Sequence, residues 1–109
     1  MDKSREVKVS AETLRQMFNE SGYWELVKSG ALSEKLYFIR TPDKKYNEPQ
    51  GTVSQILAYQ DSEGRQVALV HQFLRKDGTL GGSGRPDPKK ILYQGTMYSL
   101  ASPSIRSDP

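Results

Sequence analysis

The sequence predicts an α+β domain in which two N-terminal helices pack on an antiparallel sheet of three to five strands. Apolar residues recur at helical spacing up to about residue 30, and from residue 36 onward they follow the period of two that is typical of strands. Turn signals containing Gly and Asp separate the strand-like runs. We expect one domain over residues 1–101 and a flexible tail over residues 102–109.

Two helices are expected before the sheet. Ser10 is a typical N-cap residue, and Gly22 is a typical helix stop. The residues between them include an apolar face made by Leu14, Met17 and Phe18. A second, shorter helix that ends near Gly30 is predicted by a further apolar group, Tyr23, Trp24, Leu26 and Val27.

The strands follow the helices. Three are predicted over residues 36–41, 52–59 and 66–74, and Val7 and Val9 suggest a short leading strand. Residues 88–94 have two interpretations. Asp87 and Pro88 would begin a short helix, or residues 91–93 and 96–100 would pair around Gln94 and Gly95. The hairpin is slightly preferred, because hairpins already dominate this half of the chain.

The positive charge of the chain is concentrated in one segment. The 109 residues contain 16 Lys and Arg and 13 Asp and Glu, so the net charge is +3. The segment 71–90 contains five basic and two acidic residues and accounts for the whole excess. A concentrated patch attracts anions better than the same charge spread evenly. However, +3 is small for a protein that neutralises several nucleic-acid phosphates.

Composition excludes several classes of protein. Without Cys the chain forms no disulfide or thiolate site, and one His cannot build a His-rich metal site. We therefore expect neither a metal nor another cofactor. The longest apolar run, residues 67–70, is far shorter than a membrane span. The charged first six residues do not resemble a signal peptide, so a cytoplasmic location is expected.

His71 is the first candidate for chemistry. It alternates with Leu69, Phe73 and Arg75 on one face of the strand over residues 66–74. If that face is the core, His71 is a neutral structural residue at the core edge. If the other face is the core, His71 points outward beside Arg75. There it would act as a general base for a phosphodiester, with Arg75 stabilising the transition state.

The Gly-rich loop at residues 81–84 is the second candidate. It lacks the Gly spacing of a dinucleotide-binding loop and the Gly-Lys pair of a Walker loop. Its amides would still form an anion nest with nearby cations. The predicted anion-binding residues are Gly82, Ser83, Gly84, Arg85, Lys89 and Lys90. Tyr46, in a loop with Lys44 and Lys45, would stack on a base, but such a trio is common by chance.

Two resemblances accompany these residues. The block from His71 to Lys90, with its Gly-rich loop, resembles small uncharacterised bacterial proteins that often travel on mobile gene cassettes. This resemblance covers about the last third of the chain and implies no known activity. Two helices before an antiparallel sheet are similar to the layout of small bacterial mRNA-cleaving toxins. That similarity implies metal-independent chemistry on the sheet, for which the matching residue types are His71, Arg75, Arg85 and Tyr98.

Three functions follow as hypotheses. The first is binding of an anionic partner (nucleic acid, nucleotide or acidic protein) through the basic Gly-rich loop. The second is a metal-independent ribonuclease toxin with His71, Arg75 and Tyr98 as catalytic residues. The third is a protein-interaction module that forms a homodimer through an exposed strand edge. The sequence does not decide whether the protein is an enzyme.

Overall fold

The computed structural model describes residues 6–101, which form a six-stranded sheet with two helices. The predicted flexible tail, 102–109, lies outside the described residues. The helices are α1 (Ala11–Ser21) and α2 (Tyr23–Ser29). The strands are β1 (Glu6–Val9), β2 (Ser33–Arg40), β3 (Val53–Gln60), β4 (Gln66–Leu74), β5 (Asp87–Tyr93) and β6 (Thr96–Leu100). A short 3-10 helix, η1 (Lys44–Tyr46), interrupts the β2–β3 loop.

The α+β class is confirmed, but the predicted sheet is wrong in two respects. It has six strands in the order β1-β6-β5-β4-β3-β2, and it is mixed, because β1 pairs with β6 in parallel. The other pairs are antiparallel. A four-residue strand has little sequence signal of its own. β1 becomes regular structure through its pairing with β6, which lies some ninety residues further along the chain.

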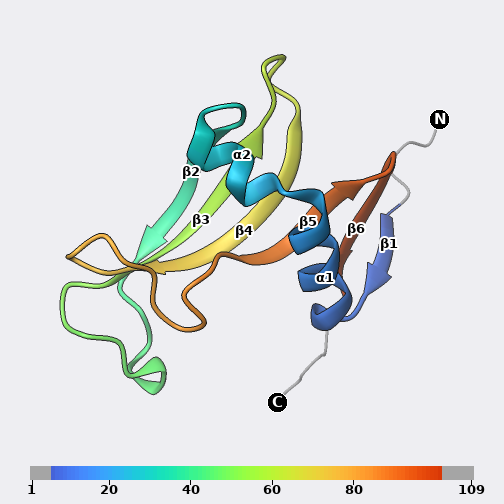
Figure 1. Ribbon diagram of the computed structural model, residues 1–109. Helices are drawn as coiled ribbons and strands as arrows, with labels where there is room; N and C mark the ends of the chain where they lie inside the picture. Colours follow the sequence, from blue (N-terminus) through green and yellow to red (C-terminus); the bar gives the residue numbers. More distant parts are fainter. Residues whose placement is uncertain (1–5, 102–109) are drawn as a thin grey trace.

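Helix boundaries follow local chemistry. The Ser10 hydroxyl oxygen accepts the backbone N–H of Thr13 at 3.1 Å, which caps α1 as the sequence predicts. Gly22 then takes the left-handed conformation with φ 71°, and this ends α1 and turns the chain directly into α2. The two helices cover one face of the sheet (Figure 1). No helix in the described part of the chain is long and apolar enough to cross a membrane.

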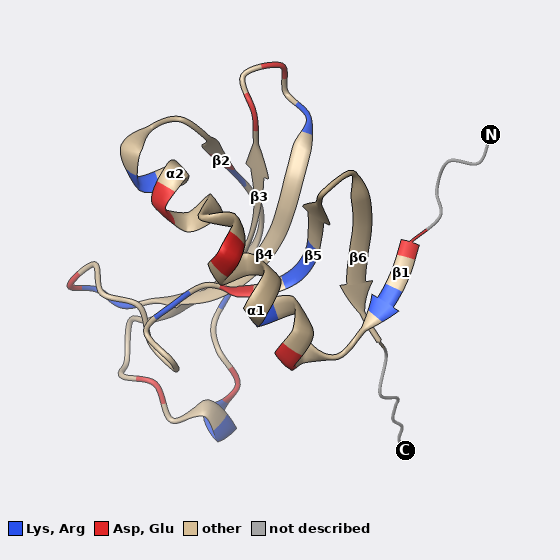
Figure 2. Ribbon diagram, turned by 45° about the vertical axis from the view of Figure 1, so that its right-hand side comes forward, with Lys and Arg blue, Asp and Glu red and all other residues tan. Residues whose placement is uncertain are grey.

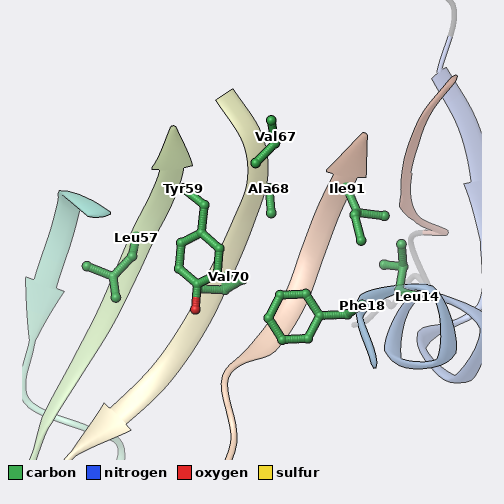
Figure 3. Packing of buried hydrophobic residues seen from close by; sticks show 8 residues of the cluster. All are labelled: Leu14, Phe18, Leu57, Tyr59, Val67, Ala68, Val70 and Ile91. Atoms are coloured by element: carbon green, nitrogen blue, oxygen red, sulfur yellow. The ribbon is translucent and has the colours of Figure 1, made fainter. Parts of the chain in front are cut away.

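The main core lies between α1 and the covered face of the sheet (Figure 3). Leu14 and Phe18 point from α1 toward Ile91 of β5, and all three are at most 1% exposed. The Phe18 ring lies 6.0 Å from that of Tyr59, which extends the core across β4 to β3. The same cluster includes Leu57, Val67, Ala68 and Val70. One helix face therefore anchors the central strands.

The segment that the sequence left open is a strand. β5 covers Asp87–Tyr93, so the alternative in which Asp87 and Pro88 begin a helix is wrong. The hairpin around Gln94 and Gly95 forms instead, with positive φ angles of 50° and 84° at these residues. A helix here would leave β4 and β6 without the strand that joins them in the sheet.

Strand pairing assigns His71 to the face opposite the helices. Val70 pairs with Leu57, and both are in the core, whereas the next pair joins His71 to Ile56. Because neighbouring side chains of a strand alternate, His71 and Ile56 belong to the face that the helices leave uncovered. We call this the open face. It contains the candidate site.

We predict that truncating Leu14 removes the main attachment of α1. Leu14→Ala should lower the free energy of unfolding by about 2–5 kcal/mol, because the cavity forms in a fully buried site. The measurement is urea denaturation followed by circular dichroism. Gln16→Ala, on the exposed side of the same helix, is the control and should change stability by less than about 0.5 kcal/mol. Equal effects of the two variants would contradict the assigned core.

Candidate functional site

His71 of β4 and Ser54 of β3 form a hydrogen-bonded pair on the open face. The Ser54 hydroxyl oxygen lies 2.7 Å from Nε2 of His71, and Ser54 is 7% exposed. Ser54 pairs with Phe73 in the sheet, so it is one position diagonal to His71 on the same face. Two strands thus hold a hydroxyl and an imidazole in contact.

A hollow of about 220 Å³ opens over this pair, and we call it the His71 hollow. Its walls come from β2, the β2–β3 loop, β3, β4 and β5. The lining residues include three aromatic side chains, two cations and one carboxylate in addition to the pair: Phe38, Tyr46, Phe73, Arg40, Lys89 and Asp43. Residues distant in the sequence therefore converge on one site.

Aromatic rings form the apolar wall of the hollow. The Tyr46 ring lies 5.1 Å from that of Phe73 at an interplanar angle of 48°. The His71 ring meets Phe73 edge-on, at 4.7 Å and 90°. Phe38, on edge strand β2, is 51% exposed and Tyr46 is 50% exposed. Both residues thus keep exposed surface, although the Arg40 guanidinium carbon lies 5.8 Å from the centre of the Phe38 ring and Lys45 Nζ lies 5.2 Å from that of Tyr46.

The charges around His71 are arranged to keep it neutral. Partial burial lowers the pKa of His71, and the Lys89 and Arg40 cations lower it further, while Asp87 opposes them. Lys89 Nζ lies 3.1 Å from an oxygen of Asp87. Lys89 has no partner residue where β5 pairs with β4, so β5 forms a bulge at this position. A β-bulge changes the direction of the side chain of its extra residue, here Lys89. At neutral pH the site thus combines an uncharged imidazole with nearby cations.

The β2–β3 loop is fastened by Glu48. One oxygen of its carboxylate accepts a hydrogen bond from Nε–H of Arg75 at 3.0 Å, and the other accepts one from the backbone N–H of Gly82 at 2.9 Å. A Cβ on residue 81 would collide with the carboxylate of Glu48, so a glycine is needed there for Glu48 to fit. Arg75 and the Gly82 amide hold the pKa of Glu48 below its usual value. The Glu48 clamp connects the loop that carries Tyr46 to the Gly-rich loop.

Most groups of the predicted anion nest already form contacts with other residues of the protein. The Gly82 amide binds Glu48, and the Arg85 guanidinium donates to Asn19 at 2.8 Å and lies 4.6 Å from the centre of the Trp24 ring. Lys90 donates to Glu6 at 3.0 Å. The Ser83 hydroxyl accepts the Arg85 amide, and Gly84 has a positive φ of 83° in the same turn. Of the six predicted residues, Lys89 is the one that lines the His71 hollow.

The predicted catalytic residues do not come together either. Arg75 is paired with Glu48, and Tyr98 pairs with Ile91 on the helix-covered face, where it packs against the core. His71 instead lies beside Ser54 and Arg40, which sequence reasoning missed. Tyr46, singled out with Lys44 and Lys45 but left outside the predicted site, lines the hollow.

No protein-family model, curated protein or solved structure matches this chain. Function must therefore be inferred from the chemistry of the His71 hollow. Among residues 6–101, no group of three or more His, Asp or Glu side chains is placed to hold a metal ion. The groups that this site offers to a ligand are cations, hydrogen-bonding side chains and aromatic rings.

We predict that His71 titrates below a free histidine, because burial and the two cations disfavour its charged form. The chain contains one His, so NMR of the imidazole follows it directly. Lys89→Met should raise the pKa, and Asp87→Asn should lower it. The unfolded chain takes up this proton first as the pH falls, so the folded state loses stability below the usual histidine pKa. The urea-unfolded protein is the reference, and a folded-state pKa at or above it would contradict the prediction.

Proposed function

We propose that the protein binds a phosphate-bearing ligand in the His71 hollow. The observation that carries the proposal is the convergence of Arg40, Lys89 and the Ser54–His71 pair on one hollow of the open face. Cations and hydrogen-bond donors placed around a partly enclosed space are what an anionic oxygen requires. The proposal keeps the anionic partner inferred from the sequence and moves its site from the Gly-rich loop to the neighbouring sheet.

The surrounding contacts support this location. Arg85 and Lys90 are engaged with Asn19 and Glu6, whereas Arg40 has no ion pair among the described residues. Arg40 lies on the exposed edge strand, and its guanidinium carbon is 5.8 Å from the centre of the Phe38 ring, so it is held beside the aromatic wall of the hollow. Lys89 would exchange its contact with Asp87 for one with the ligand.

We expect a fluorescein-labelled single-stranded decanucleotide to bind in an anisotropy titration. Arg40→Ala and Lys89→Ala should each weaken binding roughly fivefold, since each removes one charged contact. If two phosphates are neutralised, Kd should rise roughly sevenfold between about 50 and 200 mM salt.

Two other variants decide between the possible sites. Lys28→Ala, on α2, is the control and should leave Kd unchanged. Arg85→Ala tests the Gly-rich loop and should also have little effect. If Arg85→Ala weakens binding while Arg40→Ala does not, the ligand lies at the Gly-rich loop and the proposal fails. Absence of binding at low salt would also overturn it.

The Ser54–His71 contact favours a second candidate, metal-independent RNA cleavage. We propose that the Nε2–H of neutral His71 donates to the Ser54 hydroxyl, so that Nδ1 accepts the proton of a ribose 2′-hydroxyl while that oxygen attacks the adjacent phosphorus. The 5′-oxygen of the next nucleotide then leaves and takes a proton from water, which yields a 2′,3′-cyclic phosphate. Arg40 and Lys89 would offset the charge that develops at phosphorus.

We predict cleavage of a labelled RNA in the presence of EDTA, with no cleavage of the matching DNA, which lacks the 2′-hydroxyl. His71→Ala should slow the reaction by about 100-fold or more while the circular dichroism spectrum is retained. Tyr98→Phe should cleave at the wild-type rate, because Tyr98 lies on the opposite face of the sheet. Intact RNA after incubation with the wild-type protein would exclude this candidate and leave the binding proposal standing.

A further inference from the structure

We infer that the ligand of the His71 hollow is a nucleotide unit of single-stranded nucleic acid, whose base stacks on the aromatic wall while its phosphate meets Arg40 and Lys89. This inference rests on the proposed function and names its ligand class. It is carried by the three aromatic side chains that come from three separate elements, Phe38 of β2, Tyr46 of η1 and Phe73 of β4.

The aromatic wall of the hollow indicates that the ligand has a planar apolar part in addition to its phosphate. Inorganic phosphate would satisfy the cations but leave the half-exposed rings of Phe38 and Tyr46 in water. A flat ring would cover them, and stacking of a base on aromatic side chains is a principal source of affinity in proteins that bind single strands. A ligand that joins a planar ring to an anion therefore fits both parts of the hollow.

The partner is expected to be unpaired. Within a duplex, both faces of a base are covered by its neighbours, so a base reaches an aromatic wall only after leaving the stack. A single strand presents its bases without this cost. The open sheet face is lined with rings and cations in the way that sheet surfaces which bind single-stranded RNA are lined.

The charges next to the hollow favour a chain over a free nucleotide. Lys44 and Lys45 lie on η1 beside Tyr46, and Lys45 Nζ is 5.2 Å from the centre of the Tyr46 ring. Figure 2 shows this basic turn at the tip of the loop between β2 and β3. These cations are placed to meet the phosphates that flank the bound unit.

One carboxylate also lines the hollow, that of Asp43. An oxygen of Asp43 accepts the backbone N–H of Lys45 at 3.0 Å and caps η1. Its role in shaping the turn accounts for its presence. Arg40 and Lys89 line the hollow with this carboxylate, and Lys44 and Lys45 follow it on η1, so the local balance remains positive even where Lys89 is paired with Asp87.

The test compares four probes by anisotropy or competition at low salt: a single-stranded decanucleotide, the same length of abasic strand, the corresponding duplex and a nucleoside monophosphate. The decanucleotide should bind about tenfold or more tightly than the abasic strand, because each stacked base contributes substantially. The duplex and the monophosphate should also bind more weakly than the decanucleotide.

Substitutions of the aromatic residues test whether the base stacks in the His71 hollow. Phe38→Ala and Tyr46→Ala should each weaken binding of the decanucleotide by about tenfold and leave binding of the abasic strand unchanged. Tyr46→Phe should retain stacking. Tyr37→Ala is the matched control, because Tyr37 is 59% exposed on the same strand as Phe38 but does not line the hollow.

The outcomes separate the two proposals. Equal binding of the abasic strand and the decanucleotide would overturn the stacking inference and leave the phosphate site standing. Equal or tighter binding of the duplex or of the monophosphate would overturn the single-strand assignment. Failure of every probe to bind would remove the proposed function itself.

Discussion

The structure depends on one-sided packing: two short helices cover a single face of a six-stranded sheet. Leu14 and Phe18 of α1 bury Ile91 and reach Tyr59, so the central strands derive their core from that face. The opposite face has no helix over it within the described chain (Figure 1). Side chains that alternate away from the core, such as His71 and Phe73, are therefore left available for a ligand.

The loops at one end of the sheet complete the site, and the Glu48 clamp holds them. Glu48 binds Arg75 and the Gly82 amide through different oxygens, so two loops distant in the sequence share one carboxylate. Tyr46 then rests near Phe73 and closes one side of the hollow. The excess basic charge of the segment 71–90 is thus partly structural, since Arg75 and Arg85 hold loops and Lys89 reaches the hollow.

The exposed edge strand β2 bears on the homodimer hypothesis. Leu36, Tyr37, Phe38 and Ile39 are each about half exposed, which is unusual for four consecutive large apolar residues. The pairing of β2 with β3 skips Tyr37, so residues before and after it change faces. A bulge in an edge strand is one of the devices by which natural sheets avoid edge-to-edge pairing. Phe38 has a clearer role as a wall of the hollow.

The sequence by itself determined both helices, their boundaries at Ser10 and Gly22 and the β3–β4 hairpin, and it favoured the β5–β6 hairpin without deciding it. These features depend on local periodicity, capping and turn chemistry, which neighbouring residues decide. Tertiary structure alone decided which residues surround His71. Counting back from the β3–β4 turn, where Gln60 pairs with Gln66, would place Ser54 opposite Gln72 on the covered face. The pairing skips Val67, so Ser54 faces Phe73 and contacts His71 instead. Three features depend on packing between distant segments, which no local pattern encodes: the β3–β4 bulge, the parallel pairing of β1 with β6, and the hydrogen bonds of Glu48 to Arg75 and Gly82.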